Sequence, residues 1–102
     1  MYVNKLLTAA TTATPGPVME GAATPKTYQL NGITTAGTGA VSVNVEGGNN
    51  GVDFDVIGVI SLNLSTTRAS DSFQSRDTYN QVRGNVTAIS GTGASVNLTM
   101  GA

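Results

Sequence analysis

Apolar and polar residues alternate along the second half of the chain, with the period of two that is typical of β-strands. Residues 40–46 place three valines on one face and small or polar residues on the other. Residues 52–64 also alternate, but their phase changes at Gly58, and a glycine at such a point indicates a bulge or bend. The pattern predicts one long bent strand or two short strands over residues 52–64.

The C-terminal end is predicted to form a hairpin. Residues 81–90 and 94–100 both alternate, and Gly-Thr-Gly lies between them as a tight turn. The same Gly-Thr-Gly-Ala segment occurs earlier, at residues 37–40, ahead of another alternating run. Antiparallel pairing of the two C-terminal strands would bury one face of each. The residues expected on that buried face are Val82, Val86, Val96 and Leu98.

The rest of the chain carries weaker patterns. Residues 26–33 are consistent with a strand, whereas residues 65–80 are polar and irregular and are predicted to be a loop that Phe73 and Tyr79 attach to the sheet. Glycine and threonine are plentiful, and long polar helix formers are few. The sequence therefore predicts an all-β fold, a small antiparallel β-sandwich or barrel.

The first part of the chain is predicted to be an extended N-terminal arm, residues 1–24, ahead of a β-sandwich domain, residues 25–102. An apolar patch near the start precedes a stretch rich in Ala, Thr and Pro, which is typical of a linker. We expect this arm to become ordered on a neighbouring chain. Its candidate partner-binding residues are Tyr2, Val3, Leu6 and Leu7.

Charge is sparse, with five basic and six acidic residues and a net charge of −1. Charged residues make up 11% of the chain, against about 25% in a typical soluble domain. The basic residues do not cluster, so binding to nucleic acid is not expected. So few charges leave a surface poorly protected against association, unless Thr, Ser and Asn cover it. Together with a small core, this favours a homo-oligomer.

Several kinds of chemistry are excluded by composition. The chain has no Cys and no His, which rules out disulfides, thiol chemistry and imidazole ligands or bases. Arg and Asp gather within residues 65–80, but no recognisable nucleophile accompanies them, so an enzyme is not expected. Such residues are more typical of an interface ion pair. The candidate contact residues of this predicted loop are Arg68, Asp71, Arg76 and Asp77.

Residues 47–55 are similar to a calcium-binding glycine–aspartate repeat. Such a segment could bind Ca²⁺, because this ion prefers oxygen ligands on a bendable loop. There is a single copy, however, and such repeats bind between stacked turns. Asp53 and Asp55 are better explained as solvent-facing residues of one strand, so no metal or cofactor is expected. No apolar run reaches the length of a signal peptide or a membrane span, so no membrane partner is expected.

From Val41 onward the chain resembles small structural proteins of tailed bacteriophages. The resemblance is carried by a valine-rich strand, a Gly-Gly-Asn-Asn-Gly loop, Ile-Gly-Val-Ile-Ser-Leu at residues 57–62, the segment 79–94, and Val-Asn-Leu-Thr-Met-Gly at residues 96–101. It covers about sixty residues. Asn50 and Phe54 stand where the pattern has Asp and, commonly, Trp.

The resemblance implies a virion protein made in the bacterial host cytoplasm. We expect a capsid decoration or cement protein on the capsid surface, which stabilises the head by binding between subunits of the major capsid protein. By analogy with such proteins, a trimer is the favoured homo-oligomer. The alternative is a tail, neck or fibre-associated module that contacts another virion protein and could bind a host glycan. A secreted carbohydrate-binding sandwich is less well supported by the few aromatic residues.

Overall fold

The computed structural model describes residues 3–20, 25–76 and 79–101. These residues form eight strands and no helix, so they contain no helix that could cross a membrane. The strands are β1 (Val3–Ala10), β2 (Met19–Glu20), β3 (Lys26–Ile33), β4 (Ala36–Gly48), β5 (Asp55–Leu64), β6 (Ala69–Ser75), β7 (Gln81–Thr92) and β8 (Ser95–Gly101).

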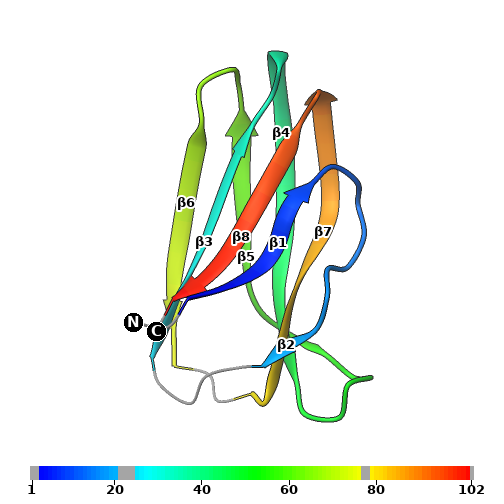
Figure 1. The fold of residues 1–102 in the computed structure, drawn as a ribbon, viewed down its shortest axis with the longest axis vertical. Coiled ribbons are helices and arrows are strands. Elements are labelled where there is room, and N and C mark those ends of the chain that lie inside the picture. The colour runs from blue at the N-terminus through cyan, green and yellow to red at the C-terminus, as the bar shows by residue number, and fades with distance from the viewer. Residues whose placement is uncertain (1–2, 21–24, 77–78, 102) are drawn as a thin grey trace.

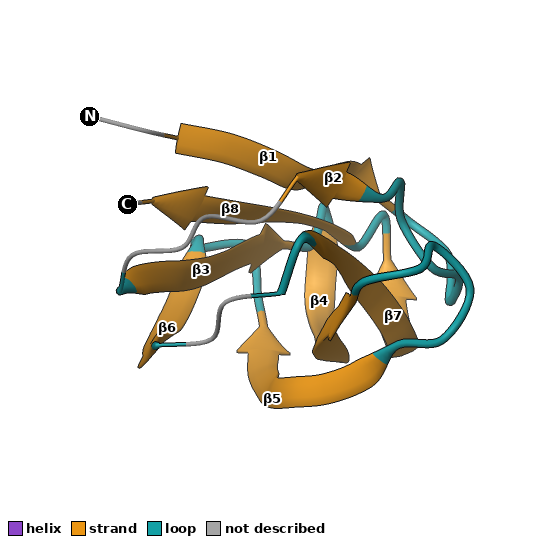
Figure 2. Cartoon of the chain, turned by 90° about the horizontal axis from the view of Figure 1, so that it is seen from below, coloured by secondary structure: helices purple, strands orange, loops and turns teal. Residues whose placement is uncertain are grey.

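The strands form two four-stranded antiparallel sheets that pack face to face. Sheet A has the order β1-β8-β3-β6, and sheet B has the order β2-β7-β4-β5. Figures 1 and 2 show the two layers, and the buried core residues lie between them. The predicted all-β sandwich is therefore confirmed.

Strand pairing is nested around one turn. β4 pairs with β5, β3 with β6, β2 with β7, and β1 with β8, so partners lie equally far along the chain from the β4–β5 connection. Among the described strands, β4 and β5 are the only consecutive pair that share a ladder, and the other connections cross between the sheets. A long hairpin folded over itself in this way is the jelly-roll arrangement of eight strands in two sheets.

The predicted hairpin of residues 81–90 and 94–100 is wrong in its pairing, although both strands exist. β7 lies in sheet B, and β8 lies in sheet A. Gly91 (φ 117°) and Gly93 (φ 64°) turn the chain from one sheet to the other. Alternation buries one face of each strand in either arrangement, so the pattern cannot distinguish them. The four residues predicted to be buried are confirmed: Val82, Val86, Val96 and Leu98.

The core follows the alternation of β4 and β5. The valines of β4 and the apolar residues 60, 62 and 64 of β5 are buried between the sheets. The predicted irregularity at Gly58 is also confirmed, because the β4–β5 register shifts there and leaves Ile57 as the extra residue. Gly58 also allows a close approach, since a Cβ atom at that position would lie 2.6 Å from Cζ of Phe73.

Residues 65–80, predicted to be an irregular loop, contain strand β6, which pairs with β3 at the edge of sheet A. Phe73 lies opposite Tyr28, with the ring centroids 5.3 Å apart. Both Phe73 and Tyr79 pack against the core, as predicted. The strand was missed because Phe73 is its one large apolar residue, so no alternation appears in the sequence.

The N-terminal segment belongs to the sandwich over the residues that the structure describes, which corrects the interpretation of residues 1–24 as an arm separate from the domain. β1 pairs with β8, and residues 14–16 and β2 follow the edge of β7. The Gly16 amide donates to the Gly84 carbonyl oxygen at 2.7 Å. Adjacent residues Leu6 and Leu7 are both buried because β1 shifts register between Lys5 and Leu7.

We predict that Leu6→Ala lowers the free energy of unfolding by about 2–5 kcal/mol, because it removes a fully buried side chain from the core. The control is Lys5→Ala, an exposed neighbour on the same strand, which should change stability by less than about 0.5 kcal/mol. Urea unfolding of the two variants measures both values. Equal, small effects would mean that β1 does not contribute to the core.

Candidate functional site

Two of the four residues predicted to form a binding arm, Leu6 and Leu7, do not lie on a free surface. Leu6 and Leu7 are core residues of the sandwich, which corrects their assignment as partner contacts. They are buried because β1 pairs with β8 in sheet A and its register shift between Lys5 and Leu7 turns both side chains into the core. Val3 begins β1, and Tyr2 lies outside the described residues.

The charged residues predicted to share one contact loop are spread along β6. Arg68 precedes this seven-residue strand, Asp71 lies within it and Arg76 follows it, and all three are exposed. Arg68 and Arg76 are therefore roughly 25 Å apart along an extended strand. Asp77 lies outside the described residues. The structure keeps these side chains available at a sheet edge, but it does not bring Arg68 and Arg76 together into a compact site.

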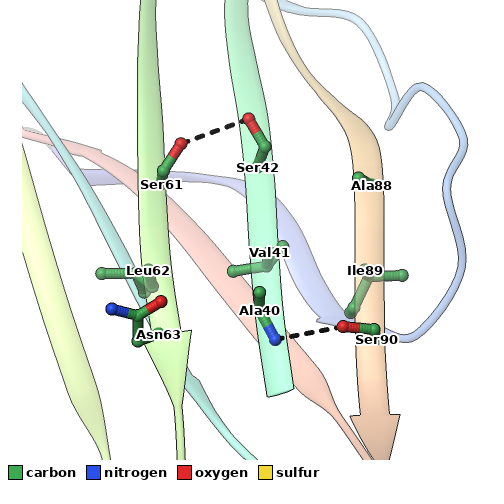
Figure 3. Close-up of a pocket in the computed structure, with 9 residues that line it drawn as sticks. All are labelled: Ala40, Val41, Ser42, Ser61, Leu62, Asn63, Ala88, Ile89 and Ser90. Atoms are coloured by element: carbon green, nitrogen blue, oxygen red, sulfur yellow. Dashed lines mark hydrogen bonds between the residues drawn. The ribbon is translucent and has the colours of Figure 1, made fainter.

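A more continuous surface lies on the outer side of sheet B. We call it the sheet B face, and it consists of Ala40, Ser42, Ser61, Asn63, Ala88 and Ser90. The strand register places these residues in two rows across β5, β4 and β7: Asn63–Ala40–Ser90 and Ser61–Ser42–Ala88. With Val41, Leu62 and Ile89 they line a depression of about 380 Å³ (Figure 3).

Local hydrogen bonds fix the side chains of this face. The Ser61 hydroxyl donates to the Ser42 hydroxyl at 3.3 Å, and the Ala40 amide donates to Ser90 Oγ at 3.2 Å (Figure 3). Beside them, Thr87 Oγ1 donates to the Ser42 carbonyl oxygen at 3.1 Å, where the β4–β7 register shifts. The face is thus pre-formed, since most of its residues are short and all three of its hydroxyl groups have protein partners.

The sheet B face can contribute shape and hydrogen bonds, but it has no charged or titratable side chain and no aromatic ring. Its small side chains let a partner surface approach the sheet closely. By contrast, the outer side of sheet A carries longer amide side chains that bond across strands, such as Gln29 to Ser70 at 3.0 Å and Asn97 to Asn31 at 3.3 Å. Of the two outer faces, the sheet B face is therefore the better candidate for a closely packed contact.

A cluster of interacting side chains bounds this face near the β4–β5 turn. Arg83 Nε donates to Glu46 Oε1 at 2.7 Å, and Asn85 Nδ2 donates to Glu46 Oε2 at 3.2 Å. The Arg83 guanidinium carbon lies 4.1 Å from the centroid of the Phe54 ring. Glu46 is buried, and both its oxygens are satisfied, so the charge of this pair is compensated within the chain.

Sequence reasoning did not find this cluster. In the sequence, Glu46 and Arg83 lie on the polar faces of two alternating segments, residues 40–46 and 81–90. Their pairing depends on β7 lying beside β4, and the alternation of the sequence does not show which strands are neighbours. One feature of the sequence could have indicated the pair: β4 has a single charged residue, Glu46, and β7 has a single charged residue of opposite sign, Arg83.

In the segment similar to a calcium-binding repeat, both aspartate carboxylates accept hydrogen bonds from other side chains of the protein. Asn50 Nδ2 donates to the Asp53 carboxylate at 3.0 Å, and the Tyr79 hydroxyl donates to the Asp55 carboxylate at 3.2 Å. Across the described residues, no group of three or more His, Cys, Asp or Glu side chains is placed to hold a metal ion.

Comparisons of this chain with protein families, with curated proteins and with solved structures found no match.

We predict that Glu46 and Arg83 stabilise the fold jointly. A double-mutant cycle of Glu46→Ala and Arg83→Ala should give a coupling energy of about 1–3 kcal/mol, because each single variant leaves a largely buried charged group without its partner. Chemical denaturation of the two single variants and the double variant measures it. Additive effects of the two substitutions would show that the pair contributes nothing beyond its separate side chains.

Proposed function

We propose that this chain is a structural protein of a tailed bacteriophage virion, a capsid decoration protein that binds between subunits of the major capsid protein. The observation that carries the proposal is the sheet B face, a broad, uncharged surface of small side chains on a rigid sandwich. Such a surface is suited to contact with another protein, and it carries no charged or titratable side chain.

Two further points support a virion role. The segments from Val41 to the C-terminus resemble small phage structural proteins, and they include β4, β5, β7 and β8 of the sandwich. Eight-stranded jelly rolls are also used in viral capsid domains. The fold by itself assigns no function, because the same architecture also occurs in lectins and cupins.

Decoration would stabilise a head by mass action. A protein that binds the assembled shell, but not its separated subunits, lowers the free energy of the assembled state by an amount that grows with its concentration. Uncharged, pre-formed surfaces favour this use, since little side-chain entropy is lost when a face of Ser, Ala and Asn becomes covered.

The proposal predicts that a charge placed on the sheet B face weakens attachment to heads. Ala88→Lys adds a long, charged side chain at an exposed position on that face. The matched control is Ser72→Lys, exposed on β6 beside the outer side of sheet A. Binding of each purified variant to heads assembled without the protein should be at least about tenfold weaker for Ala88→Lys and unchanged for Ser72→Lys.

Other results of this binding experiment would redirect the assignment. Wild-type protein that fails to bind heads but attaches to tails or necks would favour the alternative of a tail, neck or fibre-associated module. If Ala88→Lys binds heads normally and Arg76→Ala does not bind, the contact surface is the edge of β6 and not the sheet B face.

A further inference from the structure

The four edge strands of the sandwich differ in how they are protected against pairing with another chain. β1 has an exposed lysine, Lys5, two register shifts and a residue with positive φ, Ala9 (φ 48°). β2 is two residues long and follows Pro15 and Pro17. β6 carries an exposed charge, Asp71, in its interior. Lysine, proline, bulges and short length are the features that natural proteins use to prevent edge-to-edge association.

β5 lacks these features over residues 59–64. This segment contains no charge and no proline, and its register with β4 runs without interruption from Val59 to Leu64. β5 is the last strand of sheet B, so one side of its backbone has no strand partner among the described residues (Figure 2). Two valines of β5 are exposed, Val56 at 54% and Val59 at 56%. An edge of this kind is a template for strand addition.

We propose that the β5 edge pairs with the β5 edge of a second copy of this chain, related by a two-fold axis, so that two B sheets become one eight-stranded sheet. In an antiparallel pair, residues that point to the same face lie opposite each other. Val59, Ser61 and Asn63 of one copy would therefore lie opposite residues of this same set in the other copy.

The distribution of charge on the edge strands favours a second copy of this chain as the partner of the β5 edge. A two-fold interface brings a surface against itself, so a charge near the axis faces its own counterpart and is repelled. Lys5 would meet Lys5 across a β1 edge, and Asp71 would meet Asp71 across a β6 edge. Residues 59–64 carry no charge, so the β5 edge is the long edge that can meet itself without this repulsion.

This inference does not depend on a virion role. It gives a dimer, whereas the sequence-based expectation of a trimer rested on analogy. It also has a consequence for the sheet B face, because Ser61 and Asn63 belong both to that face and to β5. Pairing at β5 would join the faces of two copies into one continuous surface.

Sedimentation equilibrium of the full chain tests the proposal. We expect a dimer for the wild type and a dissociation constant at least about tenfold higher for Val59→Lys and for Asn63→Lys, since both place like charges near the axis. The matched control is Val18→Lys, at a valine that is 42% exposed beside β2 on the opposite margin of sheet B. It should dimerise like the wild type.

Cysteine cross-linking gives a second readout that does not require weakening the interface. The natural chain has no cysteine, so Ser61→Cys introduces a single thiol near the proposed axis. Mild oxidation should link two copies of Ser61→Cys, or of its neighbours Val59→Cys or Asn63→Cys, because disulfides need Cα atoms about 4.4–6.8 Å apart. Ser72→Cys on β6 should remain unlinked. The proposal would be overturned by a monomeric or trimeric wild type, or by a dimer that neither β5 lysine variant weakens. It would also be overturned if Val18→Lys weakened the dimer equally, or if Ser72→Cys became linked as readily as the β5 cysteine variants.

Discussion

The pairing of β4 with β5 around one turn is the constraint on which the rest of the structure depends. The turn is specified locally, because the Asn50 side-chain oxygen accepts hydrogen bonds from the amides of Val52 at 2.9 Å and Asp53 at 2.8 Å. Each further strand then pairs with the partner that lies equally far on the other side of this turn. The outermost pair, β1 with β8, joins the two ends of the described chain.

The nested pairing also produces the candidate site. Once β4 has β5 on one side, β7 takes the other side, and this brings Ala88 and Ser90 beside Ser42 and Ala40. The close approach of β4 and β7 where β4 begins and β7 ends requires Gly39, since a side chain at that position would meet the Ser90 carbonyl oxygen. The two Gly-Thr-Gly-Ala segments of the sequence therefore meet in space, where the ends of β4 and β7 run together.

Alternation in the sequence was sufficient to predict the fold class, the burial of Val82, Val86, Val96 and Leu98, and the irregularity at Gly58. It was not sufficient to predict which sheet each strand joins. A strand with one apolar face packs inward equally well in a hairpin or in a connection that crosses between sheets. The role of Leu6 and Leu7 was missed for a related reason: two adjacent leucines cannot both face inward on a regular strand, and only the bulge in β1 allows it. The sheet B face and the Glu46–Arg83 pair both follow from strand neighbours that are distant in sequence.

The measurement that tests this account most directly is the pattern of backbone nuclear Overhauser effects in solution. The account predicts cross-strand contacts between Val43 and Val86 and between Leu30 and Leu98, which are register partners within sheets B and A. It also predicts no ladder of backbone contacts between β7 and β8. A continuous β7–β8 ladder closing at Gly91 to Gly93 would contradict the nested pairing, and with it the placement of every residue on the sheet B face.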